Sequence, residues 1–189
     1  ESFANYAENL FVEYHFTEKE AQDYVIGCRK LIKNDSPIIG TYGLNRSGSG
    51  DMYYKGGNML HTMRHIVNDD EKWRQVLRGI NEEFWHQTVT TEEFEAYISR
   101  ASGFGPFFDQ YLRTPAIPVL AYERAGGGVS LWWQGAVSDF EVPVVVRLNG
   151  EERRVLVSAE PTRVDLAGPL RSIELDRNFY MDVAEQSAD

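Results

Sequence analysis

The period of the apolar residues changes once along this chain of 189 residues, close to Pro115 and Pro118. Before that point apolar residues recur three and four positions apart, which is the spacing of one face of an α-helix. After it, short apolar runs alternate with turn residues, which is typical of β-strands. The sequence therefore predicts an α+β chain, with helices over residues 1–115 and a small antiparallel β-sandwich over residues 116–189.

The first part contains several amphipathic segments that we expect to be helices. They lie at Phe3–Tyr14, Thr17–Ile32, Asp51–Val67, Asp70–Phe84, Thr90–Ile98 and Phe107–Leu112. Thr17 with Glu20, and Thr90 with Glu93, have the spacing of capping boxes. Residues 34–50 are rich in Gly and Ser, so we expect a long loop there. Long loops inside compact domains are often functional.

The second part contains short apolar runs that we expect to be strands. They lie at Val119–Tyr122, Val129–Trp133, Val142–Leu148, Arg154–Val157, Arg163–Leu166 and Ser172–Leu175. Asn149-Gly150 separates two of these runs and is the strongest hairpin signal in the chain. Short strands at this spacing are typical of a sandwich.

Composition excludes some classes of function. The formal net charge is −10 and the pI is near 4.9, which disfavours nucleic acid or an anionic membrane as a partner. No apolar run reaches the ~18 residues that a membrane span needs. Cys28 is the only cysteine, so no internal disulfide is possible, and its helical apolar neighbours indicate a buried, inert thiol. No compartment is indicated. The chain begins inside a helical pattern and without Met, so we expect it to be part of a longer protein.

Residues 50–61 contain the motif whose side chains are best suited to catalysis. Tyr53, Tyr54 and Lys55 stand at the start of an expected helix. A phenol hydroxyl there can donate a hydrogen bond to an oxyanion, as a hydrolase requires. The two phenols point about 100 degrees apart on a helix, so one packs while the other can face a cleft. From the residues alone, an aromatic core position with a surface lysine explains the motif about equally well.

Two other sets of residues invite a metal-site interpretation. His61 and His65 lie one turn apart on a helix, but a zincin motif needs Glu directly after the first His, and Thr62 stands there. We therefore interpret both His as structural or surface residues. Glu1 is explained either as an acid favoured by a helix dipole or as a zinc ligand carried on a helix.

The chain resembles aminopeptidase N-type zinc metallopeptidases, which are gluzincins of the membrane alanyl aminopeptidase family. The similar segments follow the family's order and cover essentially the whole chain: Glu1–Glu8, Tyr53–Gly57 with its Tyr-x-Lys-Gly element, Thr90–Phe94, Phe107–Arg113 and Pro118–Leu120. This resemblance implies the C-terminal half of a thermolysin-like catalytic lobe, followed by a β-sandwich. The activity that it implies is removal of N-terminal residues from peptides.

The resemblance also implies roles for individual residues. Glu1 corresponds to the third zinc ligand, Tyr53 to the donor that stabilises the tetrahedral intermediate, and Tyr54 to a variable packing position. The family's His-Glu-x-x-His segment, with two zinc ligands and the general base, should lie roughly twenty residues before Glu1 and is not in this chain. We therefore expect the chain alone to be inactive and to hold no zinc. Its expected partners are a peptide substrate and the N-terminal part of the same protein. The alternative is a non-catalytic peptide- or protein-binding module derived from the same fold.

Overall fold

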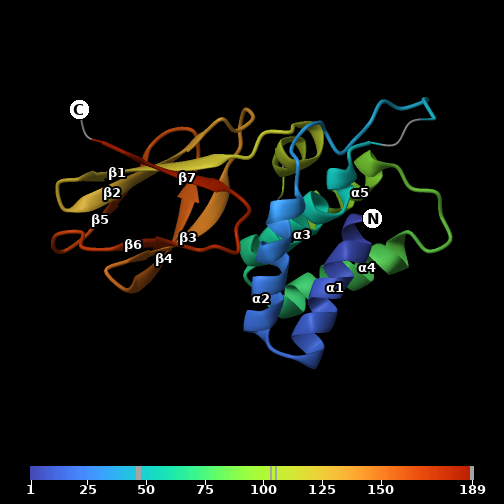
Figure 1. The fold of residues 1–189 in the computed structure, drawn as a ribbon, viewed down its shortest axis with the longest axis horizontal. Coiled ribbons are helices and arrows are strands. Elements are labelled where there is room, and N and C mark those ends of the chain that lie inside the picture. The colour runs from blue at the N-terminus through green and yellow to red at the C-terminus, as the bar shows by residue number, and fades with distance from the viewer. Residues whose placement is uncertain (46–47, 103, 105, 188–189) are drawn as a thin grey trace.

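The computed structural model describes residues 1–45, 48–102, 104 and 106–187. Helices occupy the first part of the described chain and strands the second, so the predicted α+β class is confirmed. Figure 1 shows the helices, coloured blue to green, on one side of the molecule and the strands, coloured yellow to red, on the other. Two positions of the predicted loop 34–50, residues 46 and 47, lie outside the described residues.

The helical elements agree closely with the expected segments. They are α1 (Ser2–His15), α2 (Glu18–Gly27), η1 (Cys28–Leu31), η2 (Gly50–Met52), α3 (Tyr54–Val67), α4 (Asp70–Glu83), α5 (Thr91–Ser102) and the π-helical η3 (Asp109–Arg113). Both capping boxes form, since the Thr17 and Thr90 hydroxyls accept the backbone N–H groups of Glu20 and Glu93, each at 3.2 Å. Cys28 begins η1 and is only half-buried, so the prediction of a buried thiol is wrong. Helix α2 ends at Gly27 and a 3-10 turn begins at Cys28, so Cys28 does not belong to α2 as the sequence pattern predicted.

Helix α3 is the centre of the helical part. Every residue from Lys55 to Arg64 is buried, because α1, α2, α4, η3 and strand β3 all contact this helix. The core beside it contains Tyr6 of α1 and Trp73 of α4, whose indole N–H donates to the Tyr6 hydroxyl at 3.0 Å. Helix α3 therefore fixes the relative positions of the elements around it.

The strands form two sheets within the described chain. The strands are β1 (Val119–Ala125), β2 (Gly128–Gln134), β3 (Val142–Leu148), β4 (Glu151–Val157), β5 (Thr162–Asp165), β6 (Ile173–Leu175) and β7 (Asp182–Gln186). Their order is β5-β2-β1-β7 in a four-stranded sheet and β4-β3-β6 in a three-stranded sheet. The predicted hairpin joins β3 to β4, and Asn149 and Gly150 both have positive φ, at 52° and 85°. Positive φ at both central residues is the requirement of a type I′ turn.

One pair of strands departs from the antiparallel prediction. Strand β7 pairs parallel with β1, because the chain leaves β6, crosses toward the helices and returns in the direction of β1. The sequence pattern did not reveal β7. Its residues are half-buried or exposed, so they lack the apolar alternation of the other strands.

The helices and strands share a hydrophobic core. It continues from Met63 in α3 through Phe107 and Tyr111 to Phe140 and Trp133 in the strand region. The change from helix to strand falls between Arg113 and Val119, where the sequence period changes. The division into separable units 1–115 and 116–189 stays a prediction, and the shared core argues for tight coupling between them. Among the described residues, no helix is long and apolar enough to cross a membrane.

Candidate functional site

The N-terminal ends of α1 and α3 meet although they are far apart in the sequence. The Ser2 hydroxyl donates a hydrogen bond to the Met52 carbonyl oxygen, with an O–O distance of 2.8 Å. Ser2 follows Glu1, and Met52 precedes Tyr53, so this bond joins the immediate neighbours of both predicted site residues. The fold therefore brings the backbones of Glu1 and Tyr53 to the same end of the α1–α3 pair.

Two glycines make this close approach possible. A Cβ atom on Gly56 would lie 2.0 Å from the Ser2 hydroxyl oxygen, and one on Gly57 would lie 2.2 Å from the Asn5 side-chain oxygen. Each glycine inside a helix costs about 1 kcal/mol relative to Ala. Only glycine leaves room for α1 at these two positions, which explains why the Gly-Gly pair follows Lys55 in spite of this cost.

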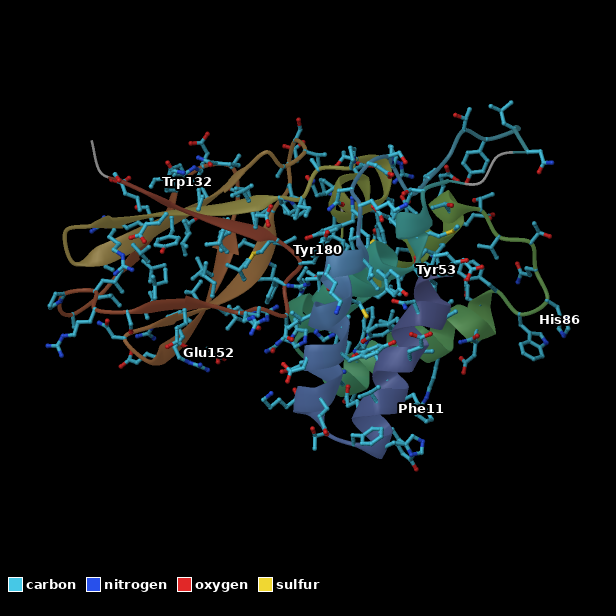
Figure 2. The ribbon with its side chains drawn as sticks, in the orientation of Figure 1. Phe11, Tyr53, His86, Trp132, Glu152 and Tyr180 are labelled. Carbon is cyan, nitrogen blue, oxygen red and sulfur yellow. The ribbon has the colours of Figure 1, made fainter. Side chains whose placement is uncertain are left out.

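Both predicted site residues present their side chains to solvent. Glu1 is exposed, and Tyr53, which is labelled in Figure 2, is 41% exposed. Glu1 occupies the N-cap position of α1, but its carboxylate makes no capping hydrogen bond to the described residues, so its oxygens are available to another partner. Tyr54 is half-buried, in keeping with a packing position. The roles of Glu1 in metal binding and of Tyr53 in catalysis stay predictions.

Lys55 is the opposite of a surface lysine. Its side chain is fully buried, and its ammonium donates to the carbonyl oxygens of Thr114 and Pro115 at 2.9 and 3.2 Å. Burial lowers the pKa of Lys55, and the Asp51 carboxylate partly opposes this shift. The alternative interpretation of Lys55 as a surface lysine is therefore wrong. Lys55 fixes the start of α3 against the segment that leads into the strands.

The turn before Tyr53 is also held by hydrogen bonds. The Asp51 carboxylate accepts the backbone N–H groups of Lys33 and Asn34 at 2.9 and 2.7 Å. The Ser49 hydroxyl accepts the N–H of Asp51 at 3.2 Å and caps η2. Sequence reasoning missed these supporting residues. The available signal was a Ser-x-Asp capping pattern directly before the Tyr-Tyr-Lys run.

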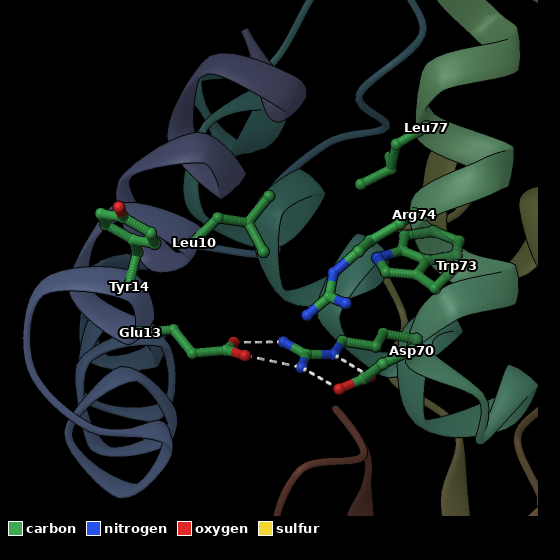
Figure 3. Close-up of a pocket in the computed structure, with 8 residues that line it drawn as sticks. Leu10, Glu13, Tyr14, Asp70, Trp73, Arg74 and Leu77 are labelled. Atoms are coloured by element: carbon green, nitrogen blue, oxygen red, sulfur yellow. Dashed lines mark hydrogen bonds and ion pairs between the residues drawn. The ribbon is translucent and has the colours of Figure 1, made fainter.

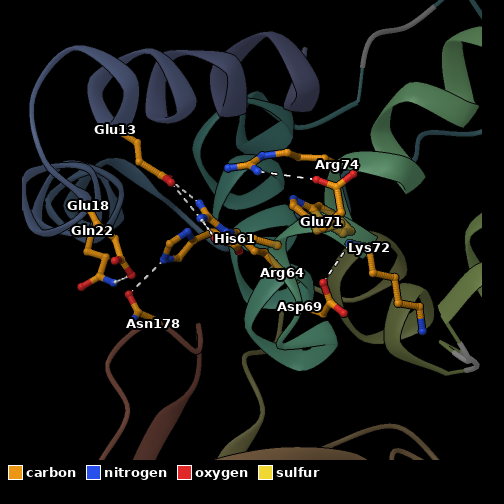
Figure 4. A network of polar contacts seen from close by, with 12 residues as sticks. Glu13, Glu18, Gln22, His61, Arg64, Asp69, Glu71, Lys72, Arg74 and Asn178 are labelled. Atoms are coloured by element: carbon orange, nitrogen blue, oxygen red, sulfur yellow. Dashed lines mark hydrogen bonds and ion pairs between the residues drawn. The ribbon is translucent and has the colours of Figure 1, made fainter.

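The histidine pair lies in the C-terminal half of α3 and contacts the segment between β6 and β7. His61 is buried, and its Nε2 atom is 3.0 Å from the Asn178 side-chain oxygen (Figure 4). The rings of His61 and His65 are 4.6 Å apart, centre to centre. Burial and the neighbouring His65 lower the pKa of His61 to about 3. The structure thus shows a histidine packed in the core, as the missing zincin glutamate indicated. Among the described residues, no group of three or more His, Cys, Asp or Glu is arranged to hold a metal.

A hollow of about 360 Å³ opens between α1 and α4 (Figure 3). Arg64 is one of its lining residues, and its guanidinium binds the carboxylates of Glu13 and Asp70, with N–O distances of 2.8 Å to each. The hydrogen bonds that Arg64 donates to Glu13 raise the pKa of Arg64, so this cation and the two carboxylates pair with one another. Glu13 lies twelve residues along α1 from Glu1, or roughly 18 Å at 1.5 Å per residue. The hollow is therefore separate from the candidate site.

Comparison with known proteins identifies a similar fold but does not identify a family. No protein family matches the sequence, and none of the curated proteins matches it either. The structure is similar to that of aminopeptidase A from Legionella pneumophila, solved in complex with aspartic acid. The TM-score is 0.69 and the sequences are 15% identical, over 98% of this chain and 23% of that chain. This likeness shows that the chain has an aminopeptidase-like fold, and that it spans less than a quarter of the length of that protein.

Proposed function

We propose that this chain is part of a zinc-dependent aminopeptidase that removes N-terminal residues from peptides. In this proposal Glu1 is a metal ligand and Tyr53 donates a hydrogen bond to the reacting carbonyl oxygen. The observation that carries the proposal is the hydrogen bond between Ser2 and Met52, because it joins the neighbours of these two residues across 50 positions of sequence. The aminopeptidase-like fold supports it.

Glu1 fits one position of a zinc site. Its carboxylate is exposed and free of capping hydrogen bonds within the described chain, and carboxylate oxygens are common zinc ligands. One carboxylate does not hold zinc with useful affinity, so two further ligands must come from outside this chain. A His-Glu-x-x-His segment would supply them together with the general base. Zinc, when bound, polarises the scissile carbonyl and activates water. We expect the chain alone to be inactive.

Tyr53 supplies the chemistry that this chain contributes itself. As the tetrahedral intermediate forms, negative charge develops on the carbonyl oxygen, and the phenol hydroxyl donates a hydrogen bond to it. A donor of this kind stabilises the transition state by roughly 3–4 kcal/mol when it is held in position beforehand. The backbone of Tyr53 is held by Ser2 on one side and by Lys55 on the other. Lys55 itself is buried, and its side-chain hydrogen bonds to Thr114 and Pro115 serve to position the backbone beside Tyr53.

A non-catalytic binding module is the second candidate. It is favoured by the aromatic side chains that α1 and the following turn expose, namely Phe11 at 59%, Tyr14 at 84% and Phe16 at 65%. Exposed apolar groups that cluster in this way often mark interaction surfaces. A module of this kind would bind peptides without hydrolysing them and would need no zinc.

The test uses the complete protein that contains this chain. We expect one zinc ion per molecule by elemental analysis and release of N-terminal residues from peptides. Glu1→Gln should lose most of the bound zinc and most of the peptidase activity, because an amide is a weaker zinc ligand than a carboxylate. Glu8→Gln, on the same helix, is the matched control and should keep both. Full zinc content and turnover in Glu1→Gln would contradict the proposal, and peptide binding without hydrolysis would favour the second candidate.

A further inference from the structure

The segment that joins β6 to β7 lies across the C-terminal half of α3. We call residues 176–181 the strap. The Asn178 side-chain oxygen is 3.0 Å from His61 Nε2, and the backbone N–H of Tyr180 donates to the Thr62 hydroxyl at 2.9 Å. Arg29 of η1 donates to the Asn178 carbonyl oxygen at 3.3 Å. The strap therefore ties the last strand of the chain to the central helix.

The hydrogen bonds of the strap define the tautomer of the neutral His61 ring. The Asn178 amide nitrogen donates to the Asp176 carboxylate at 2.9 Å, so the Asn178 oxygen is the atom that faces His61. That oxygen can only accept, so His61 carries its proton on Nε2. Its Nδ1 atom is buried and has no hydrogen-bond partner among the described residues. A second proton on this ring would therefore create a buried cation without an acceptor on Nδ1.

The charged groups around His61 disfavour a positive charge on its ring. Arg64 on α3 and Arg29 on η1 are cations close to the ring. From β4, Arg154 donates to the carbonyl oxygen of His65 at 3.2 Å. The nearby carboxylates have other partners: Glu13 of α1 and Asp70 of α4 bind Arg64, and Asp176 of the strap binds Asn178.

His65 and the strap also border a hollow of about 600 Å³ between α2 and the strands. Several charged side chains around it pair with each other: Lys19 with Asp23, and Arg147 with Glu152 and Glu174. Glu18 and Arg177 complete its charged lining. This hollow gives water a route to the edge of the interface once the strap moves.

We propose that His61 and the strap form an acid-sensitive latch, in which protonation of the buried imidazole releases the strap from α3. The latch depends on neither zinc nor peptidase activity. Its consequence is that acidification opens the contact between the helices and the strands from the His61 side.

The hydrogen bond to Asn178 by itself favours a charged ring, but burial has the larger effect and sets the direction of the pH dependence. The pKa of His61 is lowered from 6.5 to about 3 in the closed state, so the open state takes up a proton more readily. The closed state therefore keeps its full stability above pH 6.5 and loses it as the pH falls toward 3. With these values the equilibrium for opening rises about 30-fold between pH 7.5 and pH 5.0.

Hydrogen exchange of the 189-residue chain tests the latch. At pH 5.0, after correction for the intrinsic exchange rate, protection of residues 176–181 should be at least about 30-fold lower than at pH 7.5, the part that His61 contributes. Peptides from β3 should change much less. In His61→Gln, an amide that can donate to Asn178 replaces the titrating ring, so the loss of protection should be about 30-fold smaller; what remains belongs to His65, whose pKa burial lowers to about 4. His15→Gln, an exposed position, is the matched control and should behave as the unsubstituted chain.

Two results would overturn the proposal: an undiminished protection of the strap at pH 5.0, or the same loss in His61→Gln. If His61→Gln does not fold, NMR titration of the unsubstituted chain decides instead. The His61 ring signal of the closed form should then stay constant from pH 7.5 to 5.5. A titration midpoint near 6.5 in the closed form would show that the ring takes a proton without opening the strap.

Discussion

The two ends of α3 hold their polar side chains in different ways. At the N-terminal end, backbone atoms are fixed by Ser2, Asp51 and Lys55, while the Tyr53 phenol remains available to solvent. At the C-terminal end, the side chains of His61 and Arg64 are themselves buried in contacts with neighbouring elements. A reactive side chain needs a fixed backbone and a free functional group, and only the N-terminal end provides this combination. The C-terminal end stabilises the fold instead.

The largest effect on stability should come from the C-terminal end. Arg64→Met removes the cation that neutralises the half-buried Glu13 and the more exposed Asp70. Leaving such a carboxylate without a partner costs about 3 kcal/mol, so the urea midpoint should fall clearly. Arg74→Met, on the exposed side of α4, should change the free energy of unfolding by less than about 0.5 kcal/mol. Equal effects of the two substitutions would remove the contrast between the buried and the exposed arginine.

At the N-terminal end, the contact between α1 and α3 is the most sensitive point. Gly56→Val places a side chain where the Ser2 hydroxyl lies, so it should destabilise the fold by about 2–3 kcal/mol. Gly27→Ala is the matched control, because no atom lies within 4 Å of the added Cβ. It should be neutral or slightly stabilising in the same chemical denaturation experiment. A harmless Gly56→Val would mean that the two helix ends are not held together closely.

Lys55→Met should have a smaller effect of about 2 kcal/mol. It removes the donor to the Thr114 and Pro115 carbonyl oxygens, although the new side chain fills much of the same volume. Limited proteolysis should show faster cleavage between Arg113 and Pro118, because this segment loses its anchor. Lys72→Met, at an exposed position of α4, should leave both stability and cleavage unchanged. If Lys55→Met were equally neutral, the anchoring role of Lys55 would be wrong.

Local features of the sequence predicted much of the fold. The capping boxes at Thr17 and Thr90 and the turn at Asn149-Gly150 depend on neighbouring residues, so their signals are visible in a short window of sequence. Strand β7 was missed, because its residues are not strongly buried and carry no alternating pattern. Its position depends on the strap, which folds back over a helix more than a hundred residues away in the sequence.

The candidate site was less accessible to sequence reasoning. Glu1 and Tyr53 were identified only through a family resemblance, since each has an ordinary structural explanation by itself. The bond between Ser2 and Met52 spans 50 residues, and the contacts of Lys55 span about 60, so no periodic pattern reports them. The buried lysine is the clearest example. Its acceptors are backbone carbonyl oxygens, which carry no signature in the sequence.

The most direct test of the account compares two adjacent phenols in the complete protein. Tyr53→Phe removes the hydroxyl that we assign to the reacting oxygen, whereas Tyr54→Phe removes one from a half-buried packing position. We expect Tyr53→Phe to lower kcat by about 10²–10³ with unchanged zinc content, as loss of an oxyanion donor does. Tyr54→Phe should stay within a few-fold of the unsubstituted protein. Near-normal turnover of Tyr53→Phe would contradict the central claim that α1 and α3 bring a catalytic phenol to the metal ligand.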